Sequence, residues 1–330
     1  MTLSRRHLIA GAAGMVALPL GGCDVETAIE TVRRRLDPEG GRASGPAAEG
    51  AAAAPEAPAP QMSGVSETVR MPREPWTFDA FQRAMSASER PSQITEAQFA
   101  AIQARKPGAI QVISNYLAGR FGEADPAVVQ AFESVPREFF HYQYAMRQSL
   151  AFQAYEGDPK PWAIGHGSVL SDYLGQAYMT QLAQPKPTDV TLEIGTGSGF
   201  QSSLLSRIVR DAYTIEIIEP IGRAVGKIFA PLGYDNVHGR VGDGYFGWPE
   251  VEGGFDIIML TCVAQYAPPD LFAQLKPGGR MIIPIGQPFR RGQVLYVYEK
   301  DPDGRIRSRR DVGVFFIPMT GAMQQRPQPA

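Results

Sequence analysis

The sequence predicts an α/β protein with a doubly wound, mostly parallel sheet of seven strands, preceded by a helical lead-in. Three observations support this prediction. Between residues 190 and 284, short aliphatic runs alternate with helix-compatible stretches, which is the rhythm of successive βα units. Two further runs flank an Asp-Pro-Asp-Gly turn at 301–304, which indicates a hairpin at the sheet edge. Residues 76–160 show helical spacing instead.

The first residues are typical of an export signal. The basic pair Arg5-Arg6 precedes a weakly apolar run from Ala10 to Leu20, as in signals of the twin-arginine type. Residues 1–22 are therefore the predicted signal. The following Leu20-Gly21-Gly22-Cys23 resembles a lipobox, so Cys23 is a predicted lipidation site that would anchor the protein to the membrane on the periplasmic side. A misread signal and a cytoplasmic protein are the alternative.

A stretch poor in large side chains follows the predicted signal. From residue 38 to residue 60, eighteen of twenty-three residues are Ala, Pro or Gly. Such a segment cannot bury enough apolar surface to form a core. Residues 23–75 are therefore predicted to be a flexible tether, with order beginning near Trp76.

Charge and composition limit the classes of function. The chain has 32 basic and 34 acidic side chains and a net charge of −2, which argues against nucleic acid as a partner. Its two cysteines cannot form a disulfide framework. The four histidines lie far apart along the chain, so no metal site is predicted.

The folded part is predicted to begin with helices over residues 76–160. Phe81 and Met85 recur at helical spacing. Asp125-Pro126 is predicted to open a further helix, with the aspartate as cap and the proline in the first turn, and Pro136 is predicted to end it.

The sheet is predicted to lie within a second domain, residues 161–321, with a disordered tail at 322–330. Its strands are predicted, in chain order, at 190–194, 213–215, 237–241, 255–260, 280–284, 294–298 and 314–317. The helices between them are predicted at 201–209, 221–232 and 269–275.

A glycine-rich turn follows the first predicted strand of the sheet and reads Glu193-Ile194-Gly195-Thr196-Gly197-Ser198-Gly199. Alternate glycines let the backbone turn sharply and approach a ligand closely. The turn opens a helix at the carboxyl edge of the sheet, where open α/β sheets bind ligands. Its spacing differs from the dinucleotide-binding fingerprint, and it lacks the lysine of a Walker loop.

Acidic residues end the next two predicted strands. Glu216 is placed to accept hydrogen bonds from ribose hydroxyls, and Asp243, followed by Gly244, is placed to meet an adenine edge. Three such features at successive strand ends favour a nucleoside-containing ligand. A tight turn with solvated acids is the alternative.

Taken together, residues 112–321 resemble the protein-L-isoaspartate O-methyltransferase family, a branch of the S-adenosylmethionine-dependent methyltransferases. The segments that carry the resemblance are 135–140, 154–156, 164–167, 192–199, 213–216, 233–237, 241–244, 275–280 and 316–321.

The resemblance implies a Rossmann-like methyltransferase fold with S-adenosylmethionine as cofactor. It implies methyl transfer to the carboxylate of L-isoaspartyl residues in damaged proteins or peptides, which are then the substrate partners. The implied cofactor contacts are Glu193, Gly195, Thr196, Gly197, Gly199, Glu216, Asp243, Gly244 and Thr261. Ser171 is the implied residue near the acceptor. His166 is a weaker catalytic candidate, because a carboxylate needs no general base and loop structure is the simpler interpretation.

The acceptor side departs from the family pattern. Where the family has Gln-Thr-Ile-Ser-Gln-Pro, this chain has Ser168 to Tyr173, with Val169 for the threonine and Asp172-Tyr173 for the last pair. Asp172 is expected to oppose a substrate carboxylate, and loss of the proline is expected to free the loop. Cys262 is interpreted as a buried small hydrophobe. Trp248 is interpreted as a packing residue, with adenine stacking as the alternative.

The predicted export of the protein conflicts with its predicted cofactor. S-adenosylmethionine is made in the cytoplasm, so an exported methyltransferase would lack a renewable donor. Two alternatives therefore stay open beside isoaspartyl repair. One is an exported lipoprotein that keeps the fold as a ligand-binding or scaffold module without turnover. The other is a carboxyl methyltransferase for another peptide.

Overall fold

The computed structural model describes residues 69–326, which fall within one compact unit. The predicted signal, Cys23, the tether up to residue 68 and the last four residues lie outside this described part. No helix within residues 69–326 is long and apolar enough to cross a membrane.

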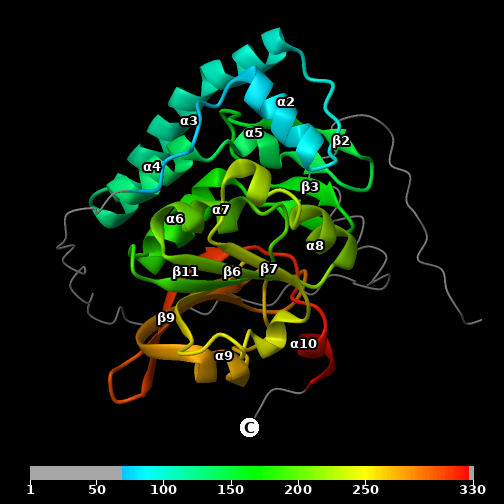
Figure 1. The fold of residues 1–330 in the computed structure, drawn as a ribbon. Helices are drawn as coiled ribbons and strands as arrows, with labels where there is room; N and C mark the ends of the chain where they lie inside the picture. Colours follow the sequence, from blue (N-terminus) through cyan, green and yellow to red (C-terminus); the bar gives the residue numbers. More distant parts are fainter. Residues whose placement is uncertain (1–68, 327–330) are drawn as a thin grey trace, which may run out of the picture. The chain divides into compact units, whose positions relative to one another are not determined.

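A seven-stranded sheet in the order β11-β10-β9-β8-β5-β6-β7 forms the centre of the described chain (Figure 1). Five strands are parallel: β5 (Val190–Ile194), β6 (Asp211–Glu216), β7 (Val237–Val241), β8 (Phe255–Leu260) and β9 (Leu275–Ile285). The antiparallel hairpin of β10 (Gln293–Lys300) and β11 (Ile306–Val314) completes one edge. The predicted doubly wound, mostly parallel sheet is confirmed.

Helices cover both faces of this sheet (Figure 1). One face carries α6 (Tyr173–Ala183), α7 (Phe200–Ile208) and α8 (Glu219–Val225), and the other carries α9 (Pro269–Gln274) and α10 (Ala322–Gln325). Both faces are covered because successive side chains of a strand point to opposite faces, and in β8 both sets of side chains are largely apolar. Its Ile257 and Met259 belong to the apolar cluster that contains α6, whereas Ile258 and Leu260 pack in the cluster that contains Leu271 of α9.

An outer layer of helices packs on α6 and α7 (Figure 1). It consists of α2 (Phe78–Ala87), α3 (Glu96–Phe121), α4 (Pro126–Ser134) and the short α5 (Arg137–Phe140). Side chains cap three of these helices: Thr77 for α2, Thr95 in a capping box for α3, and Asp125 for α4. The predicted helical lead-in is therefore present, with the predicted start and end of α4.

Short elements connect α5 to α6. They are the hairpins β1 (Tyr142–Gln143) with β2 (Gln148–Ser149) and β3 (Trp162–Gly165) with β4 (Ser168–Leu170), and the 3₁₀ turn η1 (Ala151–Gln153). Two further 3₁₀ turns, η2 (Ala230–Leu232) and η3 (Gly244–Phe246), precede and follow β7.

Two predicted elements differ in the structure. The last strand covers 306–314 and not 314–317, because its exposed, arginine-rich sequence is typical of an edge strand and lacks the apolar run used for the prediction. The helix predicted at 221–232 ends at Val225. Gly226 caps it, and Pro231 falls in the separate turn η2.

The packed chain extends beyond its predicted boundaries. Val69 is buried and the Arg70 amide donates to the Arg207 carbonyl oxygen (2.8 Å), so packing begins inside the predicted tether. The predicted disordered tail begins instead with α10, because Met323 is buried in the core beside α9. Apolar packing also continues across residue 160, since the rings of Phe140 and Phe200 meet edge-to-face at 5.3 Å.

Candidate active site

The glycine-rich turn lies between β5 and α7, with left-handed backbone at Gly195, Gly197 and Gly199 (φ 100°, 52° and 83°). Such φ values favour glycine. The hydroxyl of Thr261, the first residue after β8, donates to the Gly195 carbonyl oxygen at 2.6 Å. The turn is therefore fixed at the switch point between β5 and β8, where the chain changes direction across the sheet.

The first and third glycines of the turn, Gly195 and Gly199, are packed too closely against neighbouring side chains to carry a Cβ. A Cβ on Gly199 would lie 2.8 Å from Cγ1 of Val225, and one on Gly195 would lie 2.7 Å from the Thr261 hydroxyl oxygen. Gly197 differs, because its nearest neighbour would be the Val169 carbonyl oxygen at 3.6 Å. Gly197 is therefore the only one of these three glycines at which an added Cβ would meet no tight contact.

Glu216 ends β6 and faces the glycine turn. One carboxylate oxygen accepts from the Gly197 amide (2.8 Å) and the other from the Ile218 amide (2.9 Å). Burial raises its pKa, and these backbone hydrogen bonds oppose the shift. A carboxylate has about four acceptor positions, so Glu216 can still accept hydrogen bonds from two hydroxyls.

Glu193 lies inside β5, fully buried beside the turn. Its Oε2 accepts from the hydroxyls of Ser202 and Thr214, and Thr214 pairs in turn with the Thr196 hydroxyl (2.7 Å). Its Oε1 is buried and has no hydrogen-bond partner among the described residues. Burial raises the pKa of Glu193 to about 8, and the nearby charge of Glu216 adds to the shift.

Asp243 follows β7 and connects two backbone segments. Its Oδ1 accepts from the Tyr245 amide (2.9 Å) and its Oδ2 from the Ala322 amide (2.7 Å). The structure thus brings the C-terminal helix α10 against the residue predicted to meet adenine. Gly244 is required by close packing, because a Cβ there would overlap the side chain of Ile194.

The predicted acceptor loop lies directly against the donor turn. Strand β4 supplies the Val169 carbonyl oxygen and the Ser168 hydroxyl, which a Cβ on Gly197 would meet at 3.6 and 3.7 Å. Ser171 follows this strand, and its carbonyl oxygen accepts from the guanidinium of Arg137 at 2.6 Å. Ser171 thus follows a strand that lies beside the glycine turn, and its catalytic role stays a prediction.

His166 does not share this position. It lies exposed at the tip of the β3–β4 hairpin with φ 52°, between two glycines that also have positive φ. The structure therefore favours the interpretation of His166 as turn structure.

Asp172 and Tyr173 have structural roles in the departing loop. An oxygen of Asp172 accepts from the Gly175 amide (2.7 Å) as the N-cap of α6. Its negative charge also stabilises the charged form of the neighbouring Arg137 guanidinium, whose pKa burial lowers. The Tyr173 hydroxyl donates to the Glu156 carbonyl oxygen at 2.8 Å. The loop is thus fixed at several points, which corrects the expectation that loss of the proline frees it. Charge repulsion by Asp172 stays a prediction.

Cys262 follows Thr261 at the end of β8. It is buried, and burial raises the pKa of its thiol further above the ordinary range. A thiol of this kind is protonated at neutral pH and is a poor nucleophile. The interpretation as a small hydrophobe is confirmed.

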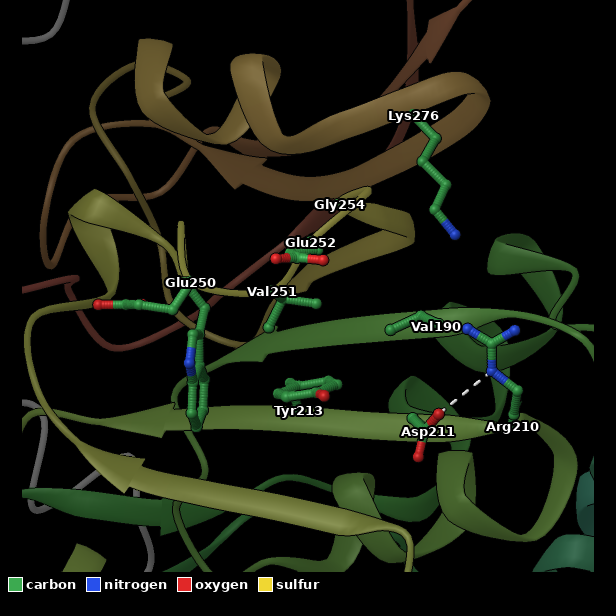
Figure 2. A pocket seen from close by; sticks show the side chains of 10 residues that line it. Val190, Arg210, Asp211, Tyr213, Glu250, Val251, Glu252, Gly254 and Lys276 are labelled. Carbon is green, nitrogen blue, oxygen red and sulfur yellow. Dashed lines mark hydrogen bonds and ion pairs between the residues drawn. The ribbon is translucent and has the colours of Figure 1, made fainter.

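A hollow of about 330 Å³ lies at the opposite, amino edge of the sheet (Figure 2). Val190 and Asp211, the first residues of β5 and β6, line it together with Trp248 and Lys276. The Trp248 ring meets the Tyr213 ring edge-to-face at 5.1 Å. Trp248 is therefore a packing residue, and its alternative role in adenine stacking is not supported.

The carboxyl edge matches the chemical groups of S-adenosylmethionine. Gly197 leaves space beside the turn, Glu216 has free acceptor positions for ribose hydroxyls, and the unpartnered oxygen of Glu193 is suited to an ammonium group. Burial raises the pKa values of Glu193 and Glu216, and a ligand with a positive charge would favour the ionised forms of both. The described residues therefore fit the implied cofactor.

A switch-point glycine turn with acids after successive parallel strands defines a nucleoside-cofactor-binding α/β protein of the methyltransferase class. The model of the family "Protein-L-isoaspartate(D-aspartate) O-methyltransferase (PCMT)" matches residues 111–324. The chain belongs to this family.

Individual relatives agree with this assignment. The chain is 47% identical over 195 residues to "Protein-L-isoaspartate O-methyltransferase 1" of Nitrosospira multiformis, which covers 59% of this chain and 79% of the relative. It is 44% identical over 197 residues to "Protein-L-isoaspartate O-methyltransferase 2" of Syntrophobacter fumaroxidans, covering 60% and 76%. A solved structure named protein-L-isoaspartate O-methyltransferase superposes with a TM-score of 0.55 at 25% identity, covering 66% of this chain and 67% of the other.

The structure adds one residue to the site that the sequence did not single out. Arg137 was recognised only as part of the Val135-to-Phe140 motif. Its contact with Ser171 joins elements 34 residues apart, and no local pattern signals such a pair.

Proposed function

We propose that this protein transfers the methyl group of S-adenosylmethionine to the carboxylate of L-isoaspartyl residues in damaged proteins or peptides. The observation that carries the proposal is the position of β4 beside the glycine turn, since a Cβ on Gly197 would lie 3.6 Å from the Val169 carbonyl oxygen. Family membership over residues 111–324 and the names of the relatives support the same reaction.

The residues of the chain position the reactants. Glu216, Glu193 and the glycine turn would hold the cofactor. When bound, it would supply a methyl group on a positively charged sulfur. The carboxylate oxygen would take this methyl group as the sulfur leaves as a neutral thioether, and no proton is lost. A carboxylate is already a nucleophile at neutral pH, so the site needs no general base. The Ser171 loop would orient the acceptor, and the position of β4 beside the turn would limit access of water.

Methyl transfer to a matched pair of peptides tests the proposal. We expect the protein to methylate a peptide that contains one L-isoaspartyl residue and to leave the same peptide with L-aspartate unmodified. Calorimetry with S-adenosylmethionine measures cofactor binding separately. Binding without transfer to the isoaspartyl peptide would contradict the repair function and favour another acceptor.

We also propose that the protein is exported and anchored at Cys23. Only the sequence supports this proposal, through Arg5-Arg6, the weakly apolar run and the lipobox-like segment ending at Cys23. We expect Cys23→Ala to move the protein from the membrane fraction to the soluble fraction, and Arg5→Lys with Arg6→Lys to retain it in the cytoplasm. Equal amounts of wild type and variants in the cytosol would contradict the proposed export and membrane anchoring.

A further inference from the structure

A buried carboxylate lies just behind the acceptor loop. Glu138, in α5, is 1% exposed, and neither of its oxygens belongs to an ion pair within 4 Å among the described residues. Its Oε1 accepts from the indole of Trp76 (2.6 Å) and the amide of Gln103 (2.5 Å), and its Oε2 accepts from the Tyr155 hydroxyl (2.7 Å). Three neutral donors therefore hold this carboxylate in one orientation.

Two of these donors come from the part of the chain that precedes the family match at residue 111. Trp76 precedes α2 and Gln103 lies in the first half of α3. Lys106 lies one turn further along α3. Burial lowers the pKa of its ammonium group, and the negative charge of nearby Glu138 counteracts part of this shift. The segment 69–110 thus supplies polar groups to a motif of the methyltransferase itself.

The hydrogen bonds continue from Glu138 to the acceptor loop. The Tyr155 hydroxyl, which donates to Glu138, accepts from the backbone amide of Arg137 at 3.0 Å. The guanidinium of Arg137 donates to the Ser171 carbonyl oxygen and to Oε1 of Gln176, both at 2.6 Å. This series of contacts, from Glu138 through Tyr155 and Arg137 to Ser171, is called the buried link below.

Arg137 also touches the donor side of the site. Its guanidinium carbon lies 4.8 Å from the ring centroid of Phe200, the residue that follows Gly199 of the glycine turn. One side chain therefore contacts the acceptor loop and the helix that begins at the donor turn. Arg137 is 2% exposed, its backbone amide is bonded to Tyr155, and its guanidinium is bonded to Ser171 and Gln176. A displacement of α5 would therefore move the Ser171 loop relative to the turn.

We infer that segment 69–110 positions the acceptor loop through the buried link, with Arg137 as the positioning residue that aligns Ser171 with the cofactor turn. The inference rests on the proposed function for its kinetic readout. It also has a structural readout, the amide hydrogen exchange of residues 168–173. Exchange reports the order of this loop whether or not an isoaspartyl peptide is the acceptor.

Gln103→Leu in the full chain tests the contribution of the added segment, and Gln111→Leu is the matched control. Gln111 lies on the same helix, is exposed and bonds to Asn115 instead. We expect Gln103→Leu to speed exchange at 168–173 and to raise KM for the isoaspartyl peptide by about ten-fold, since small misplacements of reacting groups are costly. The Kd for S-adenosylmethionine changes by less than about two-fold, because the glycine turn is untouched. Gln111→Leu changes none of these quantities.

Arg137→Lys and Arg207→Lys separate positioning from general stability. Arg207 is also buried, but it lies at the end of α7, outside segment 69–110, and its guanidinium carbon lies 4.4 Å from the ring centroid of Tyr234. We expect both variants to lower the melting temperature, and only Arg137→Lys to speed exchange at 168–173 and raise KM for the peptide. Unchanged exchange and KM in Gln103→Leu and Arg137→Lys, or equal changes in Arg207→Lys, would overturn the inference. If the wild type methylates no isoaspartyl peptide, the proposed function fails. The amide hydrogen exchange of residues 168–173 then tests by itself whether the buried link positions the acceptor loop.

Discussion

Glu193 shows how one residue of the site adds a pH dependence to the stability of the fold. Burial raises its pKa to about 8 in the folded chain, above the ordinary value of 4.5. The unfolded chain then loses its proton at lower pH than the folded chain does. The contribution of Glu193 to the free energy of unfolding is therefore largest below pH 4.5 and declines as the pH rises to about 8.

We expect Glu193→Gln to remove this pH dependence, because the amide fills the same space without a charge. Thermal unfolding between pH 5 and pH 9 should show the melting temperature of the wild type falling relative to that of the variant up to about pH 8. Titrating groups that do not interact with Glu193 are common to both proteins and cancel in the difference, whereas Glu216, whose charge raises the pKa of Glu193, contributes to it. Parallel curves over this range would show that the folded carboxyl ionises at an ordinary pH.

At the scale of an element, the glycine turn combines packing and binding in separate residues. Gly199→Ala places a Cβ 2.8 Å from Val225 at φ 83°, so we expect it to lower the free energy of unfolding by roughly 2–4 kcal/mol. Gly197→Ala has room for its Cβ and meets only the left-handed backbone cost of about 1 kcal/mol.

The two variants should therefore differ in opposite ways in two measurements. Chemical denaturation should find Gly199→Ala the less stable, whereas calorimetry should find that Gly197→Ala loses more affinity for S-adenosylmethionine, since its Cβ enters the space beside the turn. A Gly197→Ala variant with wild-type affinity would show that the cofactor does not approach this residue.

The sequence predicted elements well where burial makes a continuous apolar run. Strands β5 and β8 match their predicted bounds because they lie inside the parallel sheet and are buried along almost their whole length. Strand β7 also matches, although it is a partly exposed edge strand, because the Gly242-Asp243-Gly244 turn marks its end. Strand β11 was misplaced, because an exposed edge strand has no apolar period to detect. The cofactor turn was predictable from local spacing, whereas the Arg137–Ser171 contact was not, because it depends on the packing of α5 against the loop.

At the scale of the whole molecule, the outer helices share one apolar cluster with helices α7 and α8, which cover one face of the sheet. A single apolar cluster runs from Val69 through Phe81 and Phe139 to Phe200 of α7 and Tyr234 beside β7. The predicted domain boundary at residue 160 therefore does not coincide with a gap in the packing. A shared core of this kind favours cooperative unfolding.

Phe81→Ala tests this coupling at a site far from the glycine turn. Phe81 is fully buried and contacts the rings of Trp76 and Phe99, so we expect its truncation to lower the free energy of unfolding by about 3–5 kcal/mol. Native-state hydrogen exchange should show the same loss of protection in β5 and β8 as in α3, because these elements open together. A loss confined to the helices before residue 135 would instead show that the outer layer unfolds independently and that the sheet is stable without it.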